Sequence, residues 1–352
     1  MNEKRPAIGF TCAYTPLAVL EAAGFSGHRV LPTGGQWPDQ AGRILHDNLC
    51  PHVKKVLDRA LCNDLPELAG MVFMNSCDAM RRLYDAWIQV RPGEPALILD
   101  LPPMVTDRAI AFFAREVERM ARSLGEWNNV EVTDDALAQS IGKYNQVADL
   151  FARVRVRAAE GTLSGGAPRL QELYNDASSQ PFSETIARLE KVLTEAHGAD
   201  PAAGGVQVFL FGNVLPDPGA VDLFTQCGAR VVGDDFCTGS RLFAPLEVRD
   251  GEKPALALAR SILNNPPCAR TFDPEKPLAL AQDLLERARA CGAQGVIGHV
   301  LKFCDPYLAR LPVVRETFKQ AGMPLLLLEG DCSLGSIGQQ RTRIEAFVEM
   351  LR

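Results

Sequence analysis

The feature that most restricts the fold of this chain is a weak internal repeat of strands and helices. Residues 70–76 (GMVFMNS) predict a strand that ends in a Cys-Asp pair at Cys77, and a helix is predicted directly after it. In the second half, residues 295–303 (GVIGHVLKF) predict a strand that ends in the same pair at Cys304, again with a helix after it. Strands that are apolar on both faces and alternate with helices are typical of a parallel sheet covered on both sides. The repeat therefore predicts two similar α/β halves.

The elements that open the two halves follow the same order. Each half begins with a strand, a loop that contains proline, a short helix ended by glycine, and a second strand. These strands and helices are predicted at 7–12, 17–23 and 29–31 in the first half and at 206–213, 219–226 and 230–235 in the second.

The stretch between the halves is predicted to be mostly helical. Helices are indicated over 107–124, after Thr133 and over 183–196, with breaks at 161–168 and 197–205. We therefore predict an α/β fold of two Rossmann-like (flavodoxin-like) parallel-sheet domains with a helical connecting segment. The predicted bounds are 1–105 for the N-terminal domain, 106–204 for the connecting segment and 205–352 for the C-terminal domain.

Charge and hydropathy exclude two classes of partner. The formal net charge is −6 and the sequence pI is about 5.5, whereas a nucleic-acid surface needs clustered Lys and Arg. No apolar run approaches the roughly 20 residues of a membrane helix, and the N-terminus lacks the apolar stretch of a signal peptide. We expect a cytoplasmic protein that binds neither nucleic acid nor a membrane.

The chain contains ten cysteines, and disulfides rarely persist in a reducing compartment. Cys12, Cys227 and Cys291 fit a packing role, in which cysteine acts as a small apolar side chain. Five others stand in polar loop contexts that are typical of ligands or reactive thiols. These five are Cys50, Cys77, Cys237, Cys268 and Cys304.

The strand ends predict where two of these cysteines meet. Ligands of open α/β sheets bind beyond the carboxyl ends of the strands, so two halves that face each other would bring Cys77 and Cys304 to one cleft. Thiolates favour zinc, copper(I) or iron–sulfur clusters, but the short C-x₂-C pairs of structural zinc sites are absent. No Walker A, G-x-G-x-x-G or G-x-S-x-G motif indicates a P-loop, a nicotinamide site or a hydrolase. His52 is interpreted as solvent-facing, with a place near the site as the alternative.

Separate blocks along nearly the whole chain resemble the 2-hydroxyacyl-CoA dehydratase and benzoyl-CoA reductase family. The blocks are YTPLAVLEAAG, NLCPHVKKVL, NSCDAMRRLYDAW, DDFCTGSRLF, VLKFCDPY and GQQRTRIEAFVEML. The resemblance implies paired Rossmann-like domains that bind a [4Fe-4S] cluster through three cysteines. At the matching positions of this sequence these are Cys50, Cys77 and Cys304, of which Cys50 rests chiefly on the family match.

The resemblance also implies a reaction and its partners. A separate activator protein hydrolyses ATP and delivers one low-potential electron, which passes to the thioester carbonyl of an acyl-CoA and creates a ketyl radical. This predicts the iron–sulfur component of a radical 2-hydroxyacyl-CoA dehydratase or aryl/acyl-CoA reductase, packed against a homologous second subunit or a second copy of itself. The alternative is a non-catalytic electron-transfer protein that kept the fold and lost the substrate pocket.

One branch of the family carries a double-cubane [8Fe-9S] cluster and implies an ATP-dependent reductase of small molecules. Cys62, Cys237 and Cys268 look similar to the additional ligands of that branch. In the alternative interpretation, Cys62 lies on a helix flank and the other two belong to blocks shared by the wider family.

Four polar residues near the C-terminus are further candidates. Glu329 and Asp331 end a predicted strand, where an acid can relay a proton or bind a substrate hydroxyl, although Asp331 can instead cap a helix. Arg341 and Arg343 begin the terminal helix and are candidates for binding a phosphate or carboxylate of the substrate. A salt bridge or a solvated helix face is the alternative for this pair.

Overall fold

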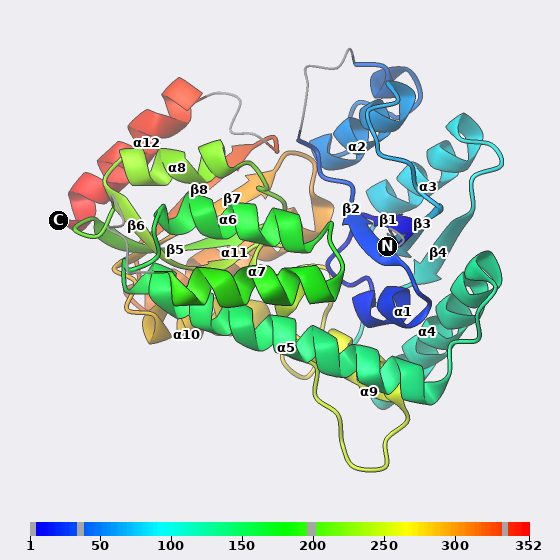
Figure 1. Ribbon diagram of the computed structural model, residues 1–352. Coiled ribbons are helices and arrows are strands. Elements are labelled where there is room, and N and C mark those ends of the chain that lie inside the picture. Colours follow the sequence, from blue (N-terminus) through cyan, green and yellow to red (C-terminus); the bar gives the residue numbers. More distant parts are fainter. Residues whose placement is uncertain (1–4, 34–38, 196–201, 333–336) are drawn as a thin grey trace.

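Two parallel four-stranded sheets lie side by side in this protein and are joined by long helices (Figure 1). The structure is a computed structural model that describes residues 5–33, 39–195, 202–332 and 337–352. The strand order is β2-β1-β3-β4 in the first sheet and β6-β5-β7-β8 in the second, which is the order of flavodoxin-like folds. The predicted α/β fold class, with two parallel sheets separated by a helical segment, is confirmed.

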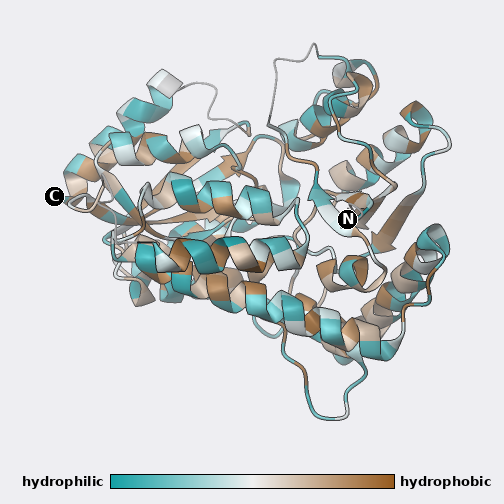
Figure 2. Cartoon of the chain, viewed as in Figure 1, coloured by the Kyte–Doolittle hydropathy of each residue, from teal (hydrophilic) through white to brown (hydrophobic). Residues whose placement is uncertain are grey.

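The strands are short, and those at the centre of each sheet are buried because helices cover both faces. Every side chain of β7 is buried, as are the first five of β3. Figure 2 shows the contrast between the hydrophobic β4 and the mixed surfaces of α6 and α7. The strands are β1 (Ala7–Phe10), β2 (Ser26–Arg29), β3 (Gly70–Asn75), β4 (Ala96–Asp100), β5 (Val206–Gly212), β6 (Ala229–Asp235), β7 (Gly295–Leu301) and β8 (Leu325–Gly330).

The helices fall into three groups along the chain. The first half contains α1 (Leu17–Ala22), the 3-10 helix η1 (Ala41–Arg43), α2 (Pro51–Leu61) and α3 (Asp78–Val90). The connecting segment contains α4 (Asp107–Asn128), α5 (Asp134–Ala159), α6 (Gly166–Ala177) and α7 (Phe182–Thr194). The second half contains α8 (Pro218–Gln226), the 3-10 helix η2 (Ser240–Phe243), α9 (Pro254–Asn264), α10 (Ala279–Ala290), α11 (Asp305–Gln320) and α12 (Ile337–Leu351).

Helix α5 holds the two halves together. It runs beneath both of them in Figure 1, and its Lys143 pairs with Glu21 of α1 at 2.8 Å. Farther along α5, the ring of Phe151 stacks on Phe243 of η2 with centroids 4.6 Å apart, and on Tyr174 of α6 at 4.8 Å. One apolar core therefore runs from the first sheet through the connecting helices to the second half. This shared core fixes the relative position of the strand ends that face each other.

Two predicted elements differ in their bounds for local reasons. The second strand is β2, which begins three residues before the predicted 29–31, because Ser26 is in parallel register with Ala7 at the edge of the sheet. An edge strand accepts the polar sequence SGHR, which an apolar pattern does not reveal. The first connecting helix extends beyond the predicted 107–124 and is closed by Asn129 with a φ of 52°, a conformation that asparagine tolerates.

Helices α6 and α9 occur where the sequence predicted none. Helix α6 begins inside the predicted break 161–168, because Gly165, with a φ of 82°, supplies the turn that enters the helix. Helices α9 and α10 lie between β6 and β7, where the first half has the single crossover helix α2. The loop between α9 and α10 carries Cys268 back to the strand ends. The predicted break 197–205 lies mostly outside the described residues.

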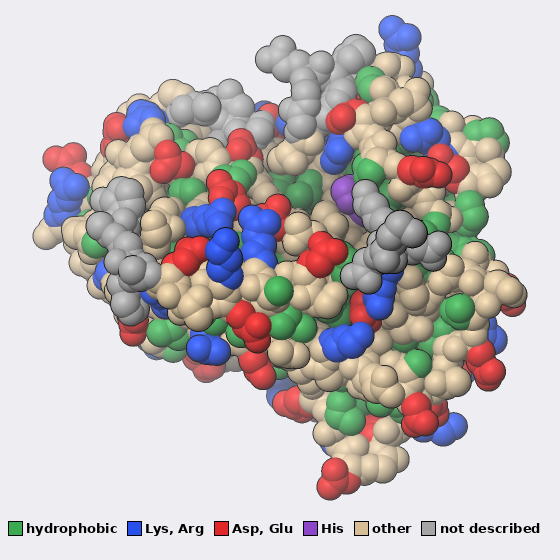
Figure 3. All heavy atoms as spheres, in the orientation of Figure 1, with side chains coloured by type: hydrophobic (Ala, Val, Ile, Leu, Met, Phe, Trp, Pro, Cys, Tyr) green, Lys and Arg blue, Asp and Glu red, His purple; other side chains and the backbone are tan. Residues whose placement is uncertain are grey.

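Within the described ranges, no helix is long and apolar enough to cross a membrane. On the face shown in Figure 3, acidic side chains lie among the basic ones, so that face presents no continuous basic surface.

Candidate functional site

A cavity of about 130 Å³ lies between the halves at the carboxyl ends of the strands. The strand order reverses between β1 and β3 in one sheet and between β5 and β7 in the other, and ligands bind at such switch points. Residues that follow these four strands line the cavity: Cys12 after β1, Cys77 after β3, Asn213 after β5 and Cys304 after β7. The internal repeat thus builds one site from equivalent ends of both sheets.

Cys50, Cys77 and Cys304 share one structural position. Each is the N-cap residue of a helix, respectively α2, α3 and α11, and each lines the cavity. The N-terminus of a helix presents free N–H groups and a positive dipole end, which stabilise negative charge on a nearby sulfur. The structure therefore brings the three cysteines predicted as cluster ligands to one cavity, with three helix N-termini around it.

Burial keeps these thiols protonated when nothing is bound. It raises the pKa of Cys50 to about 12, with smaller contributions from Cys77 and Cys304, and it raises the pKa of Cys304 to about 11. The pKa of Cys77 is raised for the same reason. Because a metal binds the thiolate, occupation of the site would displace these protons and remove the cost of burying separate charges.

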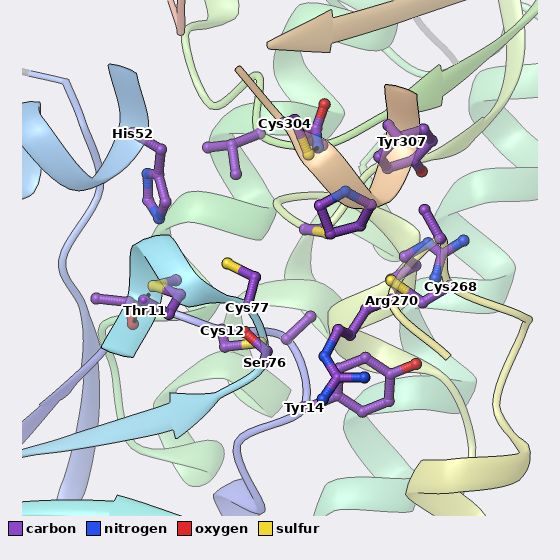
Figure 4. Close-up of a pocket in the computed structure, with 18 of the residues that line it drawn as sticks. Thr11, Cys12, Tyr14, His52, Ser76, Cys77, Cys268, Arg270, Cys304 and Tyr307 are labelled. Atoms are coloured by element: carbon purple, nitrogen blue, oxygen red, sulfur yellow. Dashed lines mark hydrogen bonds between the residues drawn. The ribbon is translucent and has the colours of Figure 1, made fainter. Parts of the chain in front are cut away.

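Three more cysteines line the same cavity, namely Cys12, Cys237 and Cys268. Figure 4 shows Cys268 and Tyr307 at one end of the cavity and His52 at the other, with Cys77 and Cys304 between them. Cys12 was predicted to pack, and it contacts the apolar cores of the first half while also lining the cavity. The repeat could have indicated this place, because Cys12 follows β1 as Asn213 follows the equivalent strand β5.

Four cysteines are not part of the cavity lining, namely Cys62, Cys227, Cys291 and Cys332. Cys62 ends helix α2 and accepts a hydrogen bond from Gln40 Nε2 at 3.4 Å. This position agrees with the helix-flank alternative for Cys62. Cys332, which sequence reasoning did not single out, is fully buried and packs against Val214 and Leu301.

The charged side chains that line the cavity are all cationic. Arg29, Arg241 and Arg270 reach it, and no Asp or Glu of the described residues does. Arg241 has a buried counterion, because its Nη2 lies 2.6 Å from Asp235 Oδ2. Arg29 is 2% exposed, and no described carboxylate pairs with it; it donates instead to the carbonyl oxygens of Thr11 and Cys237. A buried, unpaired guanidinium is costly, so the cavity favours an anionic occupant.

His52 is 4% exposed and lines the cavity, which corrects the prediction that it faces solvent. The apolar stripe of α2 places it inward, one position after the N-terminal Pro51. Neither ring nitrogen has a hydrogen-bond partner in the described part of the chain. Burial, and to a lesser degree Arg29, lowers its pKa to about 3, so the ring is neutral.

The four C-terminal candidates lie away from this cavity lining. Glu329 is exposed at the end of β8, and Asp331 follows that strand directly. Arg341 donates to Gln226 at 2.6 Å, and exposed Arg343 donates to the carbonyl oxygen of Leu327 at 2.9 Å. These contacts match the alternative in which the Arg pair belongs to the helix surface.

The chemistry of the lining fits an iron–sulfur cluster, with six cysteines, three arginines and no described carboxylate. The described residues contain no group of three or more His, Cys, Asp or Glu side chains placed to hold a metal ion. The volume of the cavity is also much larger than the volume that one water molecule needs. Soft sulfur donors in an electropositive cavity suit a large anionic group that binds thiolates. Iron–sulfur clusters held by cysteines are groups of this kind.

The chain matches the family described as 2-hydroxyglutaryl-CoA dehydratase, D-component, over residues 12–351. Among similar proteins, the lactoyl-CoA dehydratase subunit beta of Anaerotignum propionicum is 25% identical over 349 residues, covering 98% of this chain and 91% of that protein. The (R)-phenyllactyl-CoA dehydratase beta subunit of Clostridium sporogenes is 24% identical, covering 98% and 91%. One of the benzoyl-CoA reductase subunits of Thauera aromatica is 23% identical, covering 100% and 92%.

Proposed function

Since this chain belongs to the 2-hydroxyglutaryl-CoA dehydratase D-component family, we propose that it is the cluster-binding subunit of an ATP-dependent radical 2-hydroxyacyl-CoA dehydratase or aryl/acyl-CoA reductase. Relatives of both kinds, dehydratase subunits and a benzoyl-CoA reductase subunit, align with nearly its whole length. The chemistry common to both is the transfer of an electron to a CoA thioester.

One observation carries the proposal: six cysteines and three arginines, with no described carboxylate, line a single cavity between the two sheets. Cys50, Cys77 and Cys304 are the residues that would hold a [4Fe-4S] cluster. Each projects from a different helix N-terminus, so three separate elements fix the three sulfur positions. When bound, the cluster supplies one low-potential electron for thioester chemistry.

Residues of the chain itself make the cavity favourable for the negative charge of the thiolates. Arg29 supplies a buried positive charge without a counterion, which compensates the thiolates. The apolar side chains of Met80, Ile262 and Leu301 line the wall and keep water out, which strengthens every electrostatic interaction inside. Neutral His52, with both ring nitrogens free, can donate a hydrogen bond to a substrate oxygen.

Two partners follow from this function. The relatives are named as subunits, so we expect a homologous second subunit, or a second copy of this chain, packed against this one. We also expect a separate activator that hydrolyses ATP, because the sequence has no Walker A motif of its own.

A second candidate is the double-cubane reductase, and one observation favours it. Cys12, Cys237 and Cys268 add three sulfurs to the cavity lining, and Cys268 lies at the end opposite His52 (Figure 4). The additional ligand set would then include Cys12, because Cys62 is outside the cavity lining and bonded to Gln40. This candidate requires about eight irons per chain, whereas the [4Fe-4S] proposal requires about four.

Adding acyl-CoA to the anaerobically purified protein tests the choice between a catalyst and a carrier of electrons. We expect lactoyl-CoA, phenyllactyl-CoA or benzoyl-CoA to change the visible absorbance of the cluster in a saturable way, because a cluster held by only Cys50, Cys77 and Cys304 would leave one iron accessible to a substrate oxygen. Free coenzyme A with the corresponding free acid is the matched control and should leave the spectrum unchanged. A spectrum that no acyl-CoA alters would instead support the non-catalytic electron-transfer protein.

A further inference from the structure

We propose that Asn213 is a positioning residue that holds the sulfur of Cys304 and raises the reduction potential of the cluster bound there. This inference rests on the proposed function, since it concerns a ligand of that cluster. Asn213 follows β5 directly, is 9% exposed and lines the cavity. Its Nδ2 lies 2.9 Å from Cys304 Sγ.

The orientation of the Asn213 amide is fixed by its other end. Its Oδ1 accepts the backbone N–H of Leu301 at 2.9 Å. A backbone N–H can only donate, so the oxygen of the amide must face Leu301 and the NH₂ group must face Cys304. The backbone N–H of Leu301, at the end of β7, therefore fixes the orientation in which the amide donates to sulfur. Cys304 follows Leu301 on the same segment.

The backbone around Asn213 is held equally firmly. Its carbonyl oxygen accepts the N–H of Cys237 at 2.8 Å, which links it to a second cysteine of the cavity. The preceding Gly212 has a φ of 151°, and a Cβ there would collide with the carbonyl oxygen of His299. Tyr307 Oη donates to the carbonyl oxygen of Gly212 at 2.9 Å. The backbone of Asn213 is thus held in place on both sides, independently of any bound cluster.

A hydrogen bond from an amide to a ligand sulfur stabilises the reduced cluster more than the oxidised one. A neutral thiol is a weak acceptor, whereas a thiolate accepts a charge-assisted bond that strengthens as the sulfur becomes more negative. Hydrogen bonds to the sulfurs are one of the factors that set cluster potentials. In the described residues, no side-chain amide donates to Cys50 or Cys77, so Asn213 makes Cys304 unlike the other two.

Asn213→Asp is the sharpest variant for testing this role. It keeps the shape of the side chain and an oxygen for Leu301, while it replaces the donor by an acceptor and adds a negative charge. Asn213→Leu removes the donor without adding charge. The matched control is Gln40→Leu, which removes the other amide-to-sulfur bond of the described residues, at Cys62 outside the cavity lining.

The measurement is the midpoint potential of the anaerobically purified holoprotein, with iron content and circular dichroism as checks. In Asn213→Asp we expect the ratio of reduced to oxidised cluster at a fixed solution potential to fall about tenfold, a shift of about 59 mV to more negative values for one electron. Asn213→Leu should shift in the same direction and Gln40→Leu should not. Loss of iron from a variant with native circular dichroism also supports the positioning role.

A measurement without any variant covers the case in which a substitution prevents folding. In wild-type protein labelled with ¹⁵N at asparagine side chains, pulsed EPR of the reduced cluster should detect one weakly coupled nitrogen. The proposal is overturned if that coupling is absent, or if both Asn213 variants keep the iron content and potential of Gln40→Leu. Wild-type protein without iron would instead overturn the proposed function itself.

Discussion

Replacing either Cys77 or Cys304 by alanine is expected to strip the protein of its cluster. Each residue caps a helix at the end of a central strand, one in each sheet, and both line the same cavity. An alanine there leaves an iron without its ligand inside a cavity that cannot offer water freely, so the cluster is no longer retained. Iron and sulfide per chain, measured after anaerobic purification, should fall from the wild-type value to near zero.

Cys291→Ala is the matched control for these variants. Cys291 ends helix α10, and its thiol lies 3.3 Å from the carbonyl oxygen of Ala288, away from the cavity lining. This variant should keep the iron content of the wild type. Full iron content in Cys304→Ala would contradict the shared ligand site, because the cluster would then be held without the second sheet.

Reduction of the cluster is expected to require both the activator protein and ATP hydrolysis. Reduction of a CoA thioester requires an electron at a lower potential than ordinary cellular donors supply. The sequence carries no Walker A motif through which this chain could bind ATP itself. We therefore expect energy to enter through the proposed activator, in a transient contact with a modest interface. Without ATP, or with a nonhydrolysable analogue, the rate of cluster reduction and of turnover should fall to background.

The same mixture without the activator is the control for that experiment, and it should be equally inactive. Stopped-flow absorbance separates cluster reduction from substrate turnover, so each can be followed alone. Steady turnover from an NADH-linked donor with no ATP present would contradict the account. It would place the protein in a different class of reductase.

The central part of the site could be predicted because it follows the repeat. Cys77 and Cys304 end equivalent strands of two similar halves, so topology alone brings them to one cavity. Cys50 begins the crossover helix α2, and no cysteine begins α9 or α10 at the corresponding place in the second half, so the family resemblance supplied it. His52 was misjudged because its inward position depends on which face of α2 packs against the sheet.

The remaining site residues depend on contacts that no local pattern encodes. Arg29 lines the cavity only because the second half packs over the end of β2 and offers it the carbonyl oxygen of Cys237. Cys268 was predicted to lie on a loop, but its place at the cavity depends on how the segment between α9 and α10 folds back to the strand ends. Arg341 had a plausible local pattern for anion binding, yet its position on α12 is set by packing near Gln226, far along the chain.

We expect anaerobically purified wild-type protein to contain about four irons and about four acid-labile sulfides per chain, together with a brown colour that fades in air. About eight irons would move the assignment to the double-cubane candidate, in which Cys12, Cys237 and Cys268 also serve as ligands. Protein that contains stoichiometric zinc and no iron would contradict the claim that this cavity holds an iron–sulfur cluster.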